Sequence, residues 1–228
     1  MYPRYREHRT VLTAAMEDYL KAIFEVLEYQ QRATTSAIAE RLRIAPASVT
    51  AMVKRLSRLK MITYEPYQGV RFTRLGEKAA LEIVRHHRLL ELYLSEALGV
   101  PWERVHEEAE KLEHVLSEDL ENRIADSLGD TSVDPHGAPI PTREGVIRRL
   151  KTRRLSAIEP GETVKVLEVD DRNPELLKYL GSLQLFPGTT IRVTAVEPFD
   201  GPITLRMEGR EVLLGRRAAD EILVGDVA

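Results

Sequence analysis

Apolar positions recur with helical spacing through the early part of the chain. Between residues 16 and 27 they repeat every three or four positions, which predicts an amphipathic helix. A short second helix follows, with Thr35 or Ser36 as its N-terminal cap, and a third helix spans residues 47–59 after a tight turn that ends in Pro46. A short helix, a tight turn and a second helix predict a helix-turn-helix, whose second helix enters the major groove of DNA.

The third helix has one apolar face and one face of small and basic residues. Val49, Val53 and Leu56 are expected in the core. Small residues allow close approach to the groove, and basic residues bind phosphates. Residues 61–65 and 70–73 then alternate as strands around a turn from Pro66 to Gly69, which predicts a winged hairpin. The residues expected to contact DNA are Pro46, Ala47, Ser48, Thr50, Ala51, Lys54, Arg55, Arg58 and, on the wing, Arg71. A three-helix module that binds protein is the alternative interpretation.

The remaining patterns predict a helical middle and a β-rich end. Residues 75–98 and 102–128 have helical patterns, and the second run has no internal Gly or Pro. Residues 129–145 are rich in Gly, Pro and Asp and predict a loop, followed by a short basic helical piece over residues 146–155. From residue 158 onward, short alternating segments with glycine turns predict a small closed barrel. Its expected strands are residues 163–169, 190–196, 203–207 and 211–214, with one helix at 174–183. The predicted fold class is mainly α with a small β domain.

Composition adds a charge asymmetry and several exclusions. Residues 1–81 carry 14 Lys+Arg against 8 Asp+Glu, whereas residues 82–150 carry 8 against 15. A basic head beside an acidic middle predicts a polyanion-binding module next to a cation-binding one. The chain has no cysteine, hence no disulfide and no thiolate ligand. With no long apolar run and no apolar signal region behind the basic residues 1–9, a soluble, cytoplasmic protein is expected.

Two clusters of imidazoles and carboxylates are candidate metal ligands. If residues 102–128 form one helix, His106, Glu110, Glu113 and His114 lie on one face, at about 0°, 40°, −20° and 80°. Such a set can coordinate a divalent first-row metal, although a solvated acidic face with i,i+4 pairs is the alternative. His87 and Glu91 also share a helical face, at i,i+4.

Several motifs occur in an order that resembles a known family. They are Met16-Glu17-Asp18-Tyr19-Leu20, Pro46-Ala47-Ser48-Val49-Thr50, His87-Arg88-Leu89-Leu90-Glu91, Val105-His106-Glu107-Glu108-Ala109-Glu110, Leu112-Glu113-His114, and Asp134-Pro135-His136-Gly137 followed by Pro139-Ile140-Pro141. Together they resemble the diphtheria-toxin-repressor family of iron- and manganese-dependent transcriptional repressors. The resemblance covers essentially the whole chain. It implies a winged helix-turn-helix domain over residues 1–75, a helical metal-binding and dimerisation domain over 76–150, and an SH3-like β domain with its connecting segment over 151–228.

The resemblance implies a first metal site from Asp18, Glu110, Glu113 and His114. Iron-responsive members have Met and Cys where this chain has Asp18 and Glu110, and carboxylate oxygens in place of sulfur favour Mn²⁺. Small two-domain manganese regulators have a further acidic ligand where this chain has Lys21, which argues against their two-manganese cluster. Without metal, the carboxylates are expected to repel one another, and a dication reverses that sign.

The resemblance also implies a second metal site, whose full ligand set stays open. Its matching residues are His87, Glu91 and His106. Two completions remain: the loop that carries Asp134 and His136, which is otherwise a plain turn, or a carboxylate of the third domain. The candidates in that domain are Asp170, Asp171 and Glu175.

The predicted function is a manganese-dependent repressor of metal-uptake genes. A metal-loaded homodimer is expected to bind palindromic operator DNA, without a membrane or a small-molecule substrate. Fe²⁺ is the alternative effector, and Zn²⁺, Co²⁺, Cd²⁺ or Ni²⁺ are expected to substitute in vitro. The rival interpretations are a winged-helix regulator that senses an organic ligand, and a metallohydrolase. The second lacks support, because the chain has no His-Glu-x-x-His pair and no Gly-rich phosphate loop.

Overall fold

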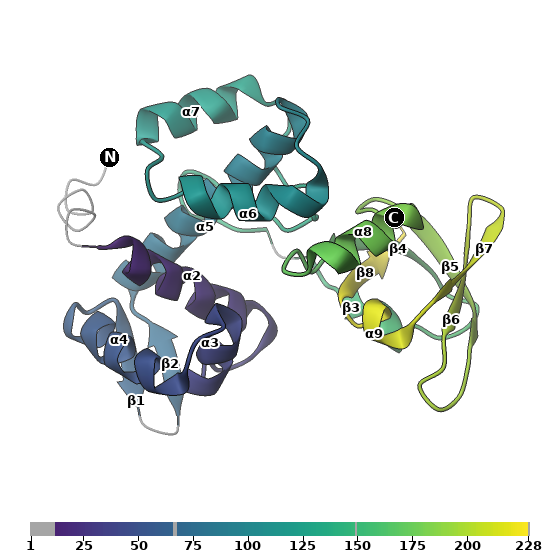
Figure 1. The fold of residues 1–228 in the computed structure, drawn as a ribbon, viewed down its shortest axis with the longest axis horizontal. Helices are drawn as coiled ribbons and strands as arrows, with labels where there is room; N and C mark the ends of the chain where they lie inside the picture. The colour runs from purple at the N-terminus through teal and green to yellow at the C-terminus, as the bar shows by residue number, and fades with distance from the viewer. Residues whose placement is uncertain (1–11, 66–67, 149, 228) are drawn as a thin grey trace. The chain divides into compact units, whose positions relative to one another are not determined.

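The computed structural model describes residues 12–65, 68–148 and 150–227 (Figure 1). The predicted basic N-terminal segment and Pro66 and Tyr67 of the predicted wing turn lie outside the described residues. The chain divides into two compact units. Unit 1 holds the described residues up to His86, together with Glu113–Val115 and Pro141–Val146. Unit 2 holds His87–Leu112, Leu116–Ile140 and the rest of the chain from Ile147.

Unit 1 contains the predicted helix-turn-helix and its wing. Its elements are α2 (Ala14–Tyr29), α3 (Thr35–Leu42), α4 (Pro46–Arg58), β1 (Ile62–Glu65) and β2 (Gly69–Phe72). The side chain of Thr34, rather than Thr35 or Ser36, caps α3 by accepting the N–H of Ala37 at 3.1 Å. Arg43, with a φ of 54°, is the C-cap of α3 and begins the turn before α4. Val49, Val53 and Leu56 are fully buried, so the predicted core face of α4 is confirmed.

The long helix α5 (Arg74–Glu96) starts directly after the wing. Gly76 lies so close to β1 that a Cβ there would stand 1.8 Å from the carbonyl oxygen of Met61. Only glycine permits that approach, and it fixes the start of α5 against the wing. The helix supplies residues to both units, with the boundary after His86.

The single helix predicted over residues 102–128 is wrong, because the chain forms two helices there. They are α6 (Trp102–Leu112) and α7 (Glu118–Ser127). Ser117 starts α7 by accepting the N–H of Leu120 at 3.3 Å, and such a cap competes with continuation of the preceding helix. Glu113 and His114 therefore lie in the turn after α6 and not on its face. In unit 2, leucines of α5 pack with Val105 and Ala109 of α6 and Ile124 of α7 in one core.

The C-terminal part of unit 2 is built on a six-stranded antiparallel sheet. Its elements are β3 (Arg153–Arg154), a 3₁₀ turn (Leu155–Ala157), β4 (Thr163–Val169), α8 (Pro174–Ser182), β5 (Thr190–Val196), β6 (Ile203–Met207), β7 (Arg210–Leu214), α9 (Arg216–Ala219) and β8 (Ile222–Asp226). The strand order is β3-β8-β4-β5-β6-β7, with register shifts in β4 and β5 where the sheet can bend around its core.

The short basic helix predicted over residues 146–155 does not form in the described part of that segment. Arg153 and Arg154 instead pair with β8, and Leu155 is fully buried in the sheet core. Burial of one leucine and pairing with a distant strand override a weak local helical pattern. Among the described residues, no helix is both long and apolar enough to span a membrane.

Candidate metal centres and DNA-binding face

The first cluster of metal-type ligands lies in unit 1, where the start of α2 meets the turn after α6. Oδ1 of Asp18 is 2.8 Å from Nε2 of His114, and Oε1 of Glu113 is 3.6 Å from the same nitrogen. One donor atom from each residue lies within 4.8 Å of the others. Two carboxylates and one imidazole nitrogen at this spacing suit a divalent first-row cation.

Glu17 belongs to this cluster, although the sequence did not single it out. Its Oε2 accepts a hydrogen bond from Nδ1 of His114 at 2.7 Å. This bond turns the other ring nitrogen, Nε2, toward Asp18 and Glu113. Carboxylates that bind the remote nitrogen of a histidine orient it as a metal ligand. Burial alone would lower the pKa of His114, but the three neighbouring carboxylates raise it.

The ammonium of Lys21 contacts both carboxylate oxygens of Glu113. Nζ donates to Oε1 at 2.7 Å and to Oε2 at 2.9 Å, and both side chains are buried. In the sequence, Lys21 stood out only because it occupies the position where small two-domain manganese regulators have an acidic ligand.

Glu110 lies on α6 in unit 2, where its Oε1 is 3.6 Å from Nε2 of His106. Its predicted place in the first site stays a prediction.

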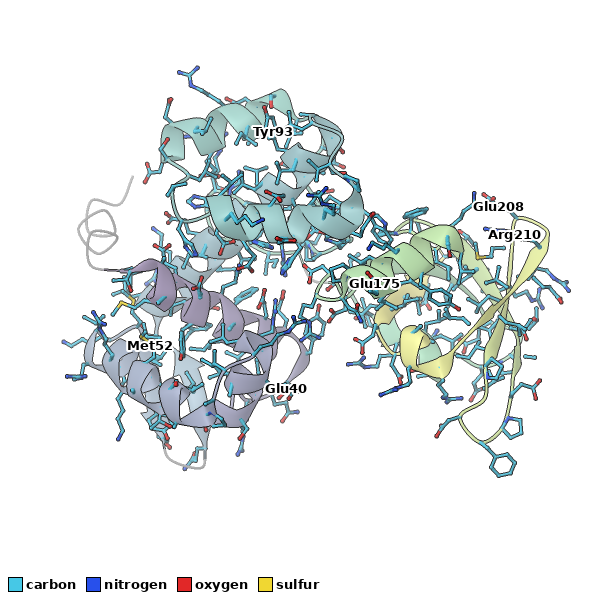
Figure 2. The ribbon with its side chains drawn as sticks, in the orientation of Figure 1. Glu40, Met52, Tyr93, Glu175, Glu208 and Arg210 are labelled. Carbon is cyan, nitrogen blue, oxygen red and sulfur yellow. The ribbon has the colours of Figure 1, made fainter. Side chains whose placement is uncertain are left out.

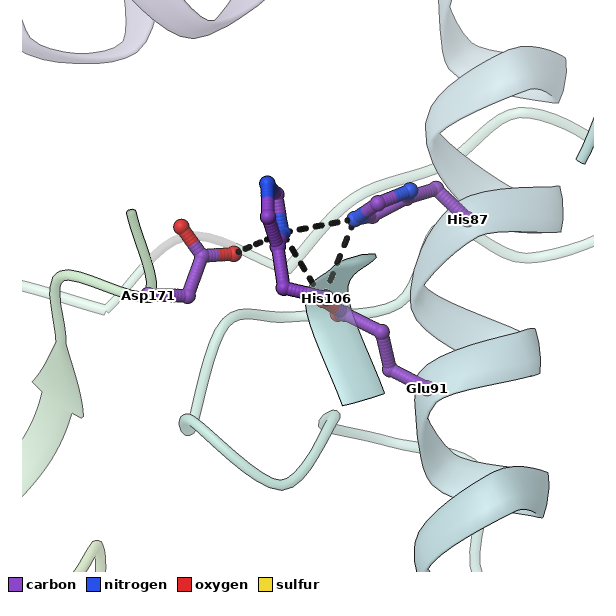
Figure 3. A group of neighbouring side chains, drawn as sticks. All are labelled: His87, Glu91, His106 and Asp171. Atoms are coloured by element: carbon purple, nitrogen blue, oxygen red, sulfur yellow. Dashed lines mark hydrogen bonds and ion pairs between the residues drawn. The ribbon is translucent and has the colours of Figure 1, made fainter. Parts of the chain in front are cut away.

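The second cluster lies in unit 2 and joins residues far apart in the sequence (Figure 3). His87 and Glu91 come from α5, His106 from α6, and Asp171 from the segment after β4. Nε2 of His87 and Nδ1 of His106 both lie 3.1 Å from Oε1 of Glu91. Oδ2 of Asp171 lies 3.1 Å from Nδ1 of His106.

Of the three carboxylates that the sequence left open in the third domain, the structure brings Asp171 to the second cluster. Asp170 instead pairs with Arg172, and Glu175 pairs with Lys178 at 2.9 Å.

The loop that carries Asp134 and His136 reaches the same cluster. Oδ1 of Asp134 accepts the N–H groups of His136 at 2.8 Å and of Ala138 at 3.0 Å. Gly137, with a φ of 91°, lies where a Cβ would stand 1.9 Å from the carbonyl oxygen of Leu167. The loop is therefore held tightly, as an Asx turn closed by glycine.

Three of the buried polar atoms without a hydrogen-bond partner among the described residues belong to this loop and to Glu91 of α5. They are Oε2 of Glu91, Oδ2 of Asp134 and Nδ1 of His136. Nε2 of His136 donates to the carbonyl oxygen of Trp102 at 2.8 Å, so Nδ1 is the atom that faces the carboxylates. Buried polar atoms without partners are rare, and these residues also lie within metal-coordinating distance of one another. The donor set fits a cation. The structure contains both of the ligand sets that the sequence left open, one with Asp171 and one with Asp134 and His136, and Glu91 belongs to both.

The electrostatics of the second cluster agree with this interpretation. Burial opposes ionisation of Glu91, but His87, His106 and His136 outweigh it and hold its pKa well below its usual range. Burial also opposes protonation of His106, yet Asp171 and Glu91 raise its pKa to about 11. Burial and the charge of Glu91 raise the pKa of Asp134. The cluster thus attracts positive charge, as protons or as a dication.

The predicted DNA-contacting residues form an exposed face on α4 and the wing. Pro46, Ala47, Ser48, Ala51, Lys54, Arg55, Arg58 and Arg71 are exposed, and Thr50 is half-buried. Arg71 pairs across the wing with Thr63. Figure 2 marks Met52 on α4 and Glu40 on α3, within the helix-turn-helix. The DNA contacts themselves stay predictions.

Three families of known domains match this chain in order. Residues 11–70 match the iron dependent repressor, N-terminal DNA binding domain. Residues 73–142 match the iron dependent repressor, metal binding and dimerisation domain. Residues 153–225 match the FeoA domain.

Curated relatives include proteins named iron-dependent repressors, and similar solved structures include manganese-dependent repressors. The chain is 29% identical over 209 residues to the diphtheria toxin repressor of Corynebacterium jeikeium, covering 82% of this chain and 87% of that protein. It is 40% identical over 114 residues to the HTH-type transcriptional regulator MntR of Oceanobacillus iheyensis, covering 50% of this chain and 77% of that protein. Among solved structures, a manganese-dependent transcriptional repressor in complex with manganese matches with a TM-score of 0.88 at 35% identity, covering 93% of this chain and 100% of that one.

Proposed function

This chain belongs to the diphtheria toxin repressor family of metal-dependent transcriptional repressors, and from that membership we propose that it is a manganese-responsive repressor that binds operator DNA as a homodimer. Family membership places the chain among DNA-binding regulators and not among enzymes. Its expected targets are metal-uptake genes, and its expected location is the cytoplasm, where that DNA lies.

The observation that supports manganese is the chemistry of the donor atoms. Asp18, Glu113 and His114 offer only oxygen and nitrogen, as do the residues of the second cluster. The chain has no cysteine that could supply a soft thiolate. Hard oxygen ligands suit Mn²⁺, although raw affinity ranks Fe²⁺ above it. Fe²⁺ is therefore the alternative effector, and Zn²⁺, Co²⁺, Cd²⁺ and Ni²⁺ are expected to substitute in vitro.

The domain assignment within this proposal follows the sequence boundaries. Residues 1–75 bind DNA, residues 76–150 bind metal and form the dimer, and residues 151–228 are the SH3-like domain. The first metal site uses Asp18, Glu113 and His114, with Glu110 as a further expected ligand. The second uses His87, Glu91, His106 and Asp171, with Asp134 and His136 beside them.

The chain's own residues connect the first site to DNA binding through α2. Asp18 is near the start of α2, and α2 packs on α3 and α4 of the helix-turn-helix. Glu17 holds His114 in place from the same helix. When bound, the dication supplies the positive charge that draws these carboxylates together. Metal binding is expected to fix the position of α2. Because α2 packs on α3 and α4, the orientation of α4 is then fixed as well.

The test compares metals with one DNA probe. Chelator-treated protein is mixed with duplex DNA selected from a random pool in the presence of Mn²⁺, and gel retardation is measured with EDTA, Mn²⁺, anaerobic Fe²⁺ or Zn²⁺. Mn²⁺ is expected to produce the shift, which should weaken as salt rises because phosphate contacts release counterions. An equal shift in EDTA contradicts metal dependence. A shift at lower free Fe²⁺ than Mn²⁺ favours the iron alternative.

A further inference from the structure

The first metal site contains a charged group that the proposed function leaves without a role, the ammonium of Lys21. Its Nζ contacts both oxygens of Glu113, at 2.7 and 2.9 Å. Lys21 is 4% exposed and Glu113 is 2% exposed, so water competes little for either partner. Both oxygens of a proposed metal ligand are thus already bound to a cation that belongs to the chain.

We propose that Lys21 is a tethered counter-ion that holds Glu113 in the metal-free protein and sets the metal concentration at which the first site fills. This inference rests on the proposed function, because it takes Glu113 as a metal ligand. It assigns to Lys21 a regulatory role that differs from ligation.

Lys21 lies on α2, the same helix that carries Glu17 and Asp18, and this position brings its positive charge close to the proposed ligands. Lys21 follows Asp18 by three residues and Glu17 by four, so its side chain is a neighbour of each of them on the helix surface. Glu17 and Asp18 contact His114, while Lys21 contacts the neighbouring Glu113. The same helix therefore brings two carboxylates and one ammonium to a single place.

This ammonium must weaken metal binding, whichever way the site adjusts. A dication that binds Glu113 beside Lys21 is repelled by a positive charge a few ångströms away. A dication that displaces Lys21 leaves a buried ammonium without its partner, which is also costly. In both cases part of the binding free energy of the metal is offset. The metal concentration needed for occupancy is then higher than the ligands alone would require.

The same contact explains how the carboxylates can share one place in metal-free protein. Glu17, Asp18 and Glu113 surround His114 in unit 1, and three carboxylates alone would repel one another. Lys21 supplies a compensating charge to the most buried of them. Its removal is expected to destabilise the metal-free state more than the metal-bound state.

The experiment removes the charge and measures affinity and stability separately. Full-length, chelator-treated wild type and Lys21→Met are titrated with Mn²⁺ by calorimetry, and their Tm is measured in EDTA and in saturating Mn²⁺. Lys21→Met is expected to bind Mn²⁺ roughly tenfold more tightly or better at the first site, because a nearby positive charge is gone. Its Tm in EDTA should fall, and the gain in Tm on adding Mn²⁺ should exceed that of wild type.

Three variants serve as controls. Lys111→Met removes an exposed lysine of α6, which pairs with Glu107 at 2.8 Å, and changes the net charge equally. It should leave Mn²⁺ affinity within about twofold, since exposed charges are screened. Lys21→Arg keeps the charge and should bind Mn²⁺ no more tightly than wild type. Glu113→Gln should lose the first-site binding event, which identifies that event in the titration.

The outcomes separate this inference from the proposed function. Unchanged Mn²⁺ binding in Glu113→Gln removes the first site itself. Lost binding in Glu113→Gln with unchanged affinity in Lys21→Met overturns the role of Lys21 alone, and equal losses of Tm with and without Mn²⁺ then assign it to packing. Should Lys21→Met fail to fold even with Mn²⁺, Lys21→Gln removes the charge while keeping a donor for Glu113, and the same affinity criterion applies to it.

Discussion

His114 uses its two ring nitrogens for two different contacts. Nδ1 bonds Glu17 at 2.7 Å, and Nε2 faces Asp18 at 2.8 Å. The helical pattern of residues 102–128 predicted His114 as a ligand, and the family resemblance added Asp18. Glu17 belongs to the same motif as Asp18, but neither the pattern nor the resemblance gave it a role. Glu17 and His114 lie 97 positions apart in the sequence. Glu17 and Asp18 are adjacent on α2, and adjacent residues of a helix do not normally share a face. Only the approach of the turn after α6 to α2 lets both carboxylates reach one ring.

Removal of Glu17 tests this orientation at the scale of one residue. Glu17→Ala is expected to weaken Mn²⁺ binding at the first site by about 10- to 100-fold, because the ligand ring loses the carboxylate that aligns it. Calorimetric titration of chelator-treated protein measures the change. Glu40→Ala, on α3, is a matched loss of one carboxylate and should leave the affinity unaltered. Wild-type affinity in Glu17→Ala contradicts the orienting role.

At the scale of elements, the break between α6 and α7 decides where the proposed ligands Glu113 and His114 lie. Periodicity alone predicted one helix, since no Gly or Pro interrupts residues 102–128. The stop signal is Ser117, which caps α7 and is followed by an acidic first turn at Glu118 and Asp119. Because α6 ends at Leu112, Glu113 and His114 lie in a turn that groups with unit 1.

Loss of that cap should lower stability without removing a ligand. Ser117→Ala is expected to reduce the free energy of unfolding by about 1 kcal/mol, the usual value of an N-cap side chain. Urea denaturation in EDTA measures the difference, with Ser117→Asp as the control that retains a capping oxygen. If Ser117→Ala unfolds at the same urea concentration as wild type, the cap does not stabilise α7.

At the scale of the whole molecule, unit 2 builds its cluster of candidate metal ligands from distant parts of the chain. α5, α6, the loop at Asp134 and the segment after β4 each contribute a ligand-type residue. The FeoA-type region therefore participates in the chemistry of this cluster through Asp171, whose carboxylate raises the pKa of His106. A histidine with a pKa of about 11 is protonated at neutral pH and must lose a proton to bind metal, so affinity for the metal should rise with pH.

Asp171→Asn tests this contribution of the third domain. The change should weaken Mn²⁺ binding at the second site and reduce the number of protons released per ion, because the pKa of His106 falls without the nearby carboxylate. Calorimetry in two buffers of different ionisation enthalpy counts those protons. The first-site event should be unaltered. Glu175→Gln, which changes a carboxylate paired with Lys178 on α8, is the control. An unchanged proton count in Asp171→Asn contradicts the role of Asp171.

The sequence by itself determined the helix-turn-helix, the wing strands, most of the β-rich end and the ligand types of both clusters. These follow from local periodicity, from turn residues and from ordered motifs, which act over a few neighbouring positions. The buried face of α4, with Val49, Val53 and Leu56, is the clearest case.

Only the tertiary structure decided which charged groups meet. Lys21 and Glu113 are 92 positions apart. Of the third-domain candidates Asp170, Asp171 and Glu175, the structure brings Asp171 to His106. The predicted helix over residues 146–155 failed for the same reason, since Leu155 is buried by strands that arrive later in the chain. Contacts between residues far apart in the sequence depend on how the helices and strands pack, and local sequence patterns do not encode that packing.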